Sequence, residues 1–289
     1  MAAAPLISIV LATLDAARTL PRCLESLRAQ SFRDFEVIVM DGASTDGTVA
    51  ILERSGDVVT QWASAADAGL YSAWNRALPL AKGEWLCFLG ADDWLWDADA
   101  LARLAPHLRG AMPDFRVVYS RIRQLDAGGG LIEELGEPWH QCQARFRSHE
   151  CLPHPGLMHH RSLFEKHGRF DESFRFAADY EFLLRELKAG DALFVPALTV
   201  GVGWGGRTTT PENFTASLRE TEAALLRHGL RPPALTWAWW KFLARFYAGL
   251  RALVGPRLAR RAADLYRVLT FRRPRYASIE RGRPEGPAP

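Results

Sequence analysis

Two adjacent acids follow one of the most apolar runs of the sequence. The run EWLCFLG, residues 84–90, has the pattern of a buried strand, and Asp92 and Asp93 come directly after it. Paired carboxylates at a strand end can hold Mg²⁺ or Mn²⁺, which prefer oxygen ligands. Such a cation would neutralise the charge that develops on a diphosphate leaving group. The alternative is a solvated turn or a helix cap before Trp94.

The elements that must position this pair alternate between strand and helix. Residues 6–12, LISIVLA, and residues 35–40, FEVIVM, are predicted strands, and apolar residues at helical spacing lie between them. Parallel neighbours need such a crossover, so we expect a doubly wound, mostly parallel α/β sheet. Ligand loops then lie at the carboxyl ends of the strands, after Ala12 and Met40.

The remaining pattern continues this alternation. Helices are predicted at residues 45–54 (capped by Ser44 or Thr45), 67–80, 97–108, 162–167 and 178–187. Strands are predicted at residues 58–62, 115–122 and 192–196, with a hairpin turn at residues 127–130. The later stretch GVGWGGRTTTP, residues 201–211, has the glycine content of a mobile loop.

Four segments in order carry a family resemblance. They are LATLDAARTLPRCLESLRAQSFRDFEVIVMDGASTDGT, ASAADAGLYSAWNRAL, KGEWLCFLGADD and FDESFRFAADYEFLLR. Together they resemble the inverting family 2 glycosyltransferases of the GT-A fold, over roughly residues 6–207. The resemblance implies a Rossmann-like donor half in residues 1–110, an acceptor half with the catalytic base in residues 111–230, and a separate tail in residues 231–289.

By this resemblance the acid pair occupies the DXD position of the family. Asp93 is then the expected ligand of Mn²⁺ or Mg²⁺, and Asp92 is expected to contact the metal, the donor ribose or a water on the metal. The sequence here is GADD, where many relatives carry an additional acid. We therefore expect few protein ligands to the metal.

The resemblance also implies a set of donor-binding residues. Thr13, Leu14 and Asp15, after the first strand, would contact the base. Asp41 and Ser44, after the second strand, would contact the base or the ribose. Asp67, Gly69 and Asn75, in DAGLYSAWNR, would contact the uridine and the sugar. Local turn, cap and helix roles are the alternative for the last two groups.

An acceptor hydroxyl is a poor nucleophile and needs a base within hydrogen-bond reach. The family places an acid at a helix start in its second half, and Asp179 in AADYE matches it, with Glu181 as the fallback and a helix cap as the alternative. Attack opposite the leaving group would give a β product from an α-linked donor. His154 is a further candidate for acceptor or metal contact, or for a structural hydrogen bond. Trp204 and Arg207 lie in the glycine-rich loop, where Arg207 would close over the diphosphate.

Positive charge is concentrated in the tail. The chain has 36 Lys and Arg against 33 Asp and Glu, yet residues 231–289 alone contain 13 against 3. Residues 235–253 and 257–271 mix aromatics and leucines with arginines, which suits an anionic membrane surface better than a nucleic acid. The alternative is a pair of helices packed on the catalytic domain or on a second subunit.

Cysteine usage and the first residues indicate the compartment. The four cysteines have no zinc-binding spacing, and the start MAAAPLISIV resembles a strand more than a signal peptide. We therefore expect a cytoplasmic protein, either free or peripheral on the inner face of the plasma membrane.

The sequence thus predicts a metal-dependent glycosyltransferase that uses a nucleotide diphosphate sugar, expected to be UDP-linked. The expected acceptor is a glycan or a glycolipid intermediate of a bacterial surface polysaccharide, with a soluble acceptor as the alternative. A nucleotidyltransferase would share the sheet and the acids, but TLDAARTLP is not a glycine-rich triphosphate loop. An inert nucleotide-binding module is the third class.

Overall fold

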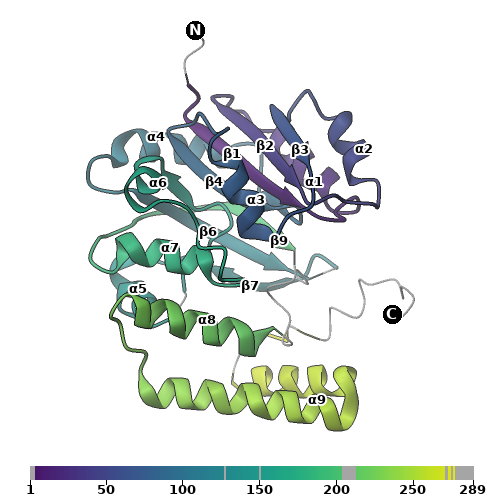
Figure 1. Ribbon diagram of the computed structural model, residues 1–289, viewed down its shortest axis with the longest axis vertical. Helices are drawn as coiled ribbons and strands as arrows, with labels where there is room; N and C mark the ends of the chain where they lie inside the picture. The colour runs from purple at the N-terminus through teal and green to yellow at the C-terminus, as the bar shows by residue number, and fades with distance from the viewer. Residues whose placement is uncertain are drawn as a thin grey trace.

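One mixed sheet, covered by helices on both faces, forms the body of the protein, and a helical layer lies at one end (Figure 1). This computed structural model describes residues 4–126, 128–149, 151–203, 213–270, 273–274 and 276. Over these residues the sheet has nine strands in the order β3-β2-β1-β4-β8-β6-β9-β5, with β7 paired to β6. The predicted α/β architecture is confirmed.

The first half of the chain forms a parallel arrangement in which β1, β2 and β3 are each followed by a helix. The order β3-β2-β1-β4 places the carboxyl ends of these four strands along one edge of the sheet. The elements are β1 (Ile7–Thr13), α1 (Leu20–Arg28), β2 (Phe35–Asp41), α2 (Thr48–Glu53), β3 (Gln61–Ser64), α3 (Leu70–Ala77) and β4 (Trp85–Gly90).

The second half adds strands of both directions. β8 pairs antiparallel with β4 and with β6, while β6 and β9 are parallel. The two halves therefore share one sheet. The elements are β5 (Asp93–Leu95), α4 (Ala100–Ala111), β6 (Val117–Leu125), β7 (Leu131–Leu135), α5 (Trp139–Phe146), β8 (Met158–His160), α6 (Ser162–His167), α7 (Ala178–Leu187), β9 (Leu193–Gly203), α8 (Phe214–Arg227) and α9 (Ala234–Leu269).

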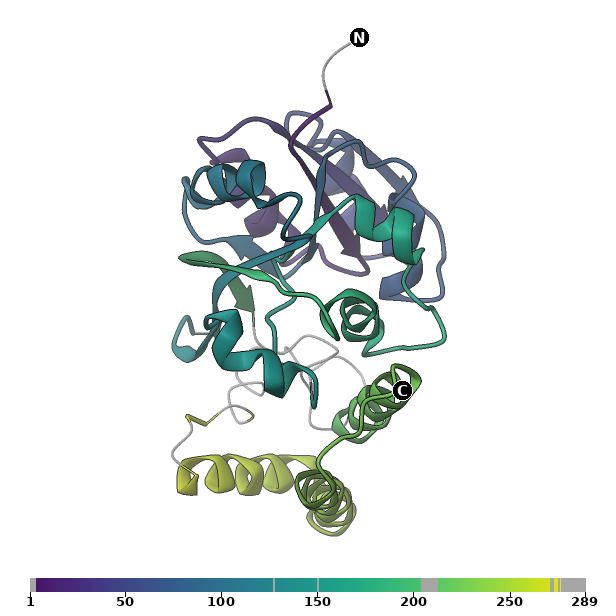
Figure 2. The same cartoon turned by 90° about the vertical axis from the view of Figure 1, so that its left-hand side faces the viewer.

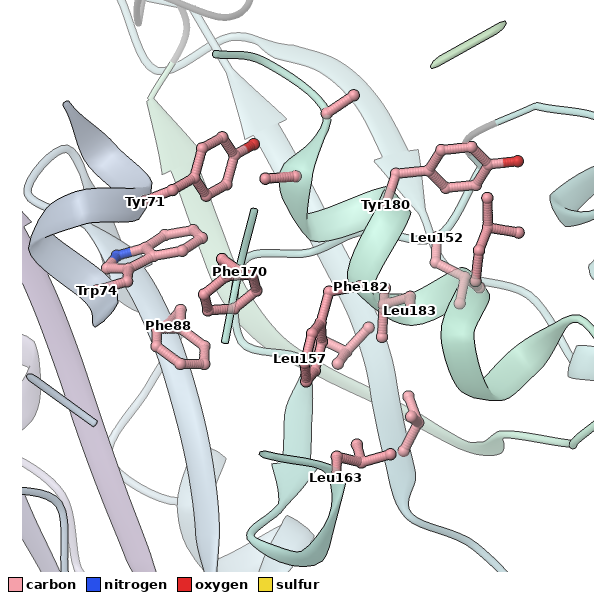
Figure 3. Packing of buried hydrophobic residues seen from close by; sticks show 14 of the residues in the cluster. Tyr71, Trp74, Phe88, Leu152, Leu157, Leu163, Phe170, Tyr180, Phe182 and Leu183 are labelled. Atoms are coloured by element: carbon pink, nitrogen blue, oxygen red, sulfur yellow. The ribbon is translucent and has the colours of Figure 1, made fainter. Parts of the chain in front are cut away.

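Side chains of the central strands alternate between two apolar cores. On β2, Val37 and Val39 face the core beneath α1 and α4, whereas Ile38 and Met40 face the core beneath α3 and α7. The helices contribute their predicted faces; α1, for example, buries Leu20, Cys23, Leu24 and Leu27. Figure 3 shows the second core, where rings from α3, β4 and α7 meet around Phe170.

The start of α2 differs from the prediction. The helix begins at Thr48, after Gly47 in a left-handed conformation (φ 98°), and neither Ser44 nor Thr45 caps it. The Ser44 hydroxyl is already bonded to the Asp41 carboxylate, and the Thr45 amide donates to Asp15. Asp41, three residues away, and Asp15, 30 residues away, therefore bind the groups that the sequence pattern assigned to a helix cap.

The start of the predicted mobile loop is part of a strand. Residues 201–203 belong to β9, where Gly201 pairs with Trp94 and Val202 with Asp93 of β5. A Cβ on Gly201 would lie 2.2 Å from the Trp94 ring. This glycine therefore permits close packing rather than motion. Trp204 and Arg207 lie outside the described residues.

The tail forms one long helical element with a break. α9 has non-helical angles at Gly255 (φ 79°), followed by Pro256, which divides it near the predicted boundary between two helices. The first segment packs against α8, as in the alternative of helices packed on the catalytic domain. In the part of the chain that the structure describes, no helix has the length and apolar content to cross a membrane.

Candidate functional site

The ends of β1, β2 and β4 meet in register at one edge of the sheet. Thr13 lies opposite Asp41, and Ala12 lies opposite Gly90. The loops after these strands are therefore neighbours. This arrangement brings most of the residues predicted to bind the donor into one region.

Asp41 braces this edge from inside. Its carboxylate accepts hydrogen bonds from the hydroxyls of Thr13 (2.8 Å), Ser44 (2.5 Å) and Ser64 (2.6 Å) and from the Ser44 amide (2.9 Å). Burial raises the pKa of this carboxyl, but the hydrogen bonds outweigh burial and hold the pKa below its ordinary value. Asp41 is fully buried, so it and the Thr13 hydroxyl hold the loops together in the structure, and their predicted contact with base or ribose stays a prediction.

Two loops are joined above this brace. The Asp15 amide donates to the Ser44 hydroxyl (2.8 Å), and the Asp15 carboxylate accepts from the Thr45 amide (2.9 Å). Asp15 and Ala43 both have left-handed backbones, with φ of 48° and 62°. Such conformations persist in non-glycine residues only when neighbours impose them. The β1 and β2 loops therefore form one preorganised rim.

Leu14, Gly42 and Asp67 are packed closely beside this rim. A Cβ placed on Gly42 would lie 3.3 Å from Asp67 Oδ2, 3.4 Å from Leu14 Cδ1 and 3.5 Å from the Thr13 carbonyl oxygen. Asp67 Oδ1 accepts from the Gly69 amide at 2.9 Å, which fixes the turn that leads into α3. Leu14, Asp67 and Gly69 are thus brought together as predicted, with Leu14 exposed.

The acid pair converges over another glycine. A Cβ on Gly90 would lie 2.7 Å from Asp92 Oδ1 and 3.2 Å from Asp93 Oδ2, so both carboxylates flank one point. Asp93 Oδ2 also accepts from the Gly90 amide at 2.8 Å. Burial raises the pKa of both carboxyls, and the neighbouring Asp92 raises the pKa of Asp93 further.

This donor set fits a hard divalent cation. Two carboxylates supply oxygen ligands, and a cation between them would relieve the repulsion by Asp92 that raises the pKa of Asp93. Within the described ranges, no group of three or more His, Cys, Asp and Glu side chains is arranged to hold a metal.

A third carboxylate, that of Asp179, lies in the first turn of α7. Its Oδ1 accepts hydrogen bonds from the Tyr71 hydroxyl (2.9 Å) and the Tyr180 amide (2.8 Å). Its Oδ2 lies 3.9 Å from His154 Nδ1. Figure 3 shows the Tyr71 hydroxyl pointing toward the start of α7. Burial raises the pKa of Asp179 above the ordinary carboxyl value, although the two hydrogen bonds oppose this change.

His154 connects Asp179 to the end of β4. Its ring stacks on Trp74 (centroids 5.2 Å apart) and lies 6.2 Å from the Phe88 ring. The loop that carries His154 precedes β8, whose first residue, Met158, pairs with Cys87. Burial lowers the pKa of His154 to about 3, so its ring is neutral, and its Nε2 has no hydrogen-bond partner within the described residues. The acid pair and Asp179 therefore stand at the same edge of the sheet.

Two predicted residues are used elsewhere. The Asn75 side-chain oxygen accepts from the backbone amide of Phe170 (3.0 Å), and its Nδ2 donates to the Phe170 carbonyl (2.9 Å) and to the Glu172 carboxylate (2.8 Å). Asn75 therefore holds the segment before α7 rather than the donor side. Glu181 is buried between α7 and α8, where it pairs with Arg185 and with His228 (2.9 Å). The structure does not place Glu181 with Asp179 as an alternative base.

Tyr71 is the residue that the sequence did not reveal. Its position, four residues after the family-like Asp67 and on the buried face of a predicted helix, was the available signal. A buried tyrosine hydroxyl needs a partner, and here the partner lies 108 residues away.

Sequence comparison finds related proteins of known class. The sequence profile of glycosyl transferase family 2 matches residues 8–141. A PGL/p-HBAD biosynthesis glycosyltransferase of Mycobacterium bovis is 36% identical over 191 residues, which cover 63% of this chain and 70% of that protein. Chondroitin synthase of Escherichia coli is 30% identical over 193 residues, covering 64% of this chain but 27% of the synthase.

Two solved structures share the fold. The mannosyltransferase PcManGT of Pyrobaculum calidifontis, in complex with GDP-Man and Mn²⁺, superposes with a TM-score of 0.64 at 18% identity, covering 96% of this chain and 84% of that one. Residues 1–349 of TarS from S. aureus, in complex with UDP-GlcNAc, give 0.59 at 20% identity, covering 85% and 74%.

The fold is of the GT-A type. The chain belongs to glycosyl transferase family 2. It is therefore a glycosyltransferase.

We expect Glu181→Gln to lower stability and to spare the reaction. Gln removes a buried charge that Arg185 and His228 face, so the free energy of unfolding should fall by about 3 kcal/mol. Chemical denaturation measures this change, and donor binding and transfer by the folded fraction should persist. Asp114→Asn, on an exposed turn, is the matched control and should leave stability unchanged. Loss of transfer at unaltered stability would instead assign Glu181 to the reaction.

Proposed function

We propose that this glycosyltransferase inverts the anomeric centre as it moves a sugar from a UDP-linked donor to an acceptor hydroxyl, with a divalent cation at Asp92 and Asp93 and with Asp179 as the base. The observation that carries the proposal is the position of these carboxylates. Asp92 and Asp93 follow β4, and Asp179 reaches the same sheet edge through His154, which precedes the strand paired with β4.

On the donor side, the loops that carry Leu14, Gly42 and Asp67 would contact the base, and we propose uracil as this base. The likeness to TarS, which was solved with UDP-GlcNAc, supports this choice, whereas PcManGT was solved with GDP-Man. Competition between UDP and GDP for the apo protein distinguishes the two.

The metal assignment rests on the donor set. When bound, Mn²⁺ or Mg²⁺ supplies positive charge to the departing diphosphate. Asp93, fixed at the start of β5 and by the Gly90 amide, would hold the cation, and the partly exposed Asp92 would complete the site or contact the ribose. The complex of PcManGT with Mn²⁺ supports a metal in this fold.

The base assignment rests on the surroundings of Asp179. Its raised pKa makes the carboxylate a better proton acceptor than an ordinary aspartate. Tyr71 and the Tyr180 amide hold Oδ1, which leaves Oδ2 to take the proton of the acceptor hydroxyl. The neutral His154 ring beside Oδ2 limits access by water and orients the carboxylate.

For the acceptor we propose a glycan or glycolipid hydroxyl, presented on the cytoplasmic side of a membrane. The four cysteines, Cys23, Cys87, Cys142 and Cys151, are free thiols, as expected in a reducing compartment. None of the relatives described above is named as a nucleotidyltransferase, so that alternative gains no support. An inert module would bind donor without releasing UDP.

Asp179→Asn tests the proposed reaction. The amide cannot accept the proton, so transfer should fall by about 10²- to 10⁴-fold. Luminescent detection of released UDP measures the rate, and calorimetry should give an unchanged affinity for UDP. Asp114→Asn serves as the matched exposed control. Full transfer by the Asp179 variant would refute the base assignment.

Tyr71→Phe should move the pH dependence of transfer in a defined direction. The Tyr71 hydroxyl stabilises the charged form of Asp179, so its removal raises the pKa of this carboxyl further. The base is then deprotonated only at higher pH, and the acidic limb of kcat/KM shifts upward. Profiles at saturating Mn²⁺ measure the shift, with the exposed Tyr266→Phe as control. An unmoved limb would contradict the role of Asp179.

Gly90→Ala should weaken the metal site without removing a ligand. The added methyl group would lie 2.7 Å from Asp92 Oδ1, so the carboxylates must move apart. We expect a raised Mn²⁺ concentration for half-maximal transfer and loss of activity at a lower chelator concentration. Gly110→Ala, in α4 with open space around it, is the control. Full activity of the wild type after exhaustive chelation would overturn metal dependence.

A further inference from the structure

The first segment of α9 carries an apolar stripe on its outer side. Its members are large and exposed: Leu235 (88%), Trp239 (49%), Phe242 (53%), Phe246 (59%) and Leu253 (87%). With 3.6 residues per turn these positions fall within an arc of about 60°. The rings of Trp239, Phe242 and Phe246 stack in a row, with centroids 5.5 and 6.1 Å apart.

The opposite side of the same segment is fixed to the domain. Trp237 is 3% exposed, and its indole Nε1 donates to the Ser148 carbonyl at 3.3 Å. Ala244 is buried, and Lys241 pairs with Glu222 of α8 at 2.7 Å. The orientation of the helix is thus determined by packing, and the stripe points away from the protein.

The second segment repeats this design. Leu258, Leu265 and Leu269 are 54–70% exposed at spacings that place them on one side, while Ala259 and Arg267 are buried on the other. Figures 1 and 2 show both segments in one layer across the end of the molecule opposite the N-terminus. We call residues 234–269 the α9 layer.

The positive charge of the α9 layer indicates which kind of surface it binds. It contains seven Lys and Arg and one Asp, and the exposed Arg245 and Arg261 lie beside the apolar stripes. A second copy joined through this layer would bring two strongly cationic surfaces together, which like-charge repulsion opposes. Aromatic and leucine side chains bordered by arginines instead suit the headgroup region of an anionic bilayer.

We infer that the α9 layer docks on the surface of an anionic phospholipid membrane. The apolar stripes enter the headgroup and acyl boundary, and the arginines contact lipid phosphates. The helix lies on the bilayer and does not cross it. This inference goes beyond the proposed function. It also gives α8 a role, because α8 joins the layer to α7, which carries Asp179.

Vesicle co-sedimentation of the full chain, without donor or acceptor, tests the inference. We expect binding to vesicles of phosphatidylcholine mixed with phosphatidylglycerol, weak binding to phosphatidylcholine alone, and loss of binding as salt is raised. The variant Trp239→Ser/Phe242→Ser/Phe246→Ser should lose at least about tenfold in affinity. Arg245→Glu/Arg261→Glu should bind less to anionic vesicles only.

Matched controls separate docking from folding. Leu226→Ser removes an exposed apolar residue (58%) from α8, outside the layer, and should bind vesicles like the wild type. All variants should keep their thermal unfolding and their affinity for UDP, so failure of the donor assignment is distinguishable from failure of docking. Equal binding to neutral and anionic vesicles, or none to either, would overturn the inference. So would sedimentation velocity showing a dimer that the triple variant dissociates.

Discussion

Two carboxylates held over a single glycine at the end of a buried strand are unfavourable as a pair of anions. The backbone enforces this proximity, because Gly90 ends β4 and Asp93 begins β5, which is locked by its pairing with Val202 of β9. Burial raises both pKa values, and Asp92 raises the pKa of Asp93 further, so the pair favours either a proton or a cation. The register of β4 with β1 places the two carboxylates beside the loops that would hold a nucleotide.

The acids at the sheet edge divide by how fully they are hydrogen-bonded. Asp41 accepts four hydrogen bonds from neighbouring groups, and its pKa is lowered. Its carboxylate is fully hydrogen-bonded and holds the loops in place. Asp92, Asp93 and Asp179 have raised pKa values and fewer donors. Unsatisfied carboxylates of this kind are available for a ligand, which is why carboxylates with raised pKa values mark functional sites.

The sequence predicted those features that depend on local pattern. α6 and α7 occur at the predicted residues, and α9 breaks near the predicted boundary, because periodicity and the Gly-Pro pair act within a few residues. The roles of Asn75 and Glu181 depend on partners 95 and 47 residues away, which no local pattern contains. The sequence predicts a mobile loop at Gly201, since the contact of this glycine with Trp94 arises only in the folded sheet and leaves no local pattern. β5, with three residues, was too short to give a periodic signal.

Helix α3 links the two halves of the candidate site. It starts after the Asp67–Gly69 turn, beside Gly42 and Leu14. From the same helix Tyr71 bonds to Asp179, and Asn75 holds the segment at Phe170 that leads into α7. A shift of α3 would therefore act directly on the surroundings of Asp179. The rings of Trp74 and Phe170 pack behind these contacts with their centroids 5.4 Å apart. The position of Asp179 relative to the loops after β2 and β3 thus depends on contacts between residues far apart in the chain.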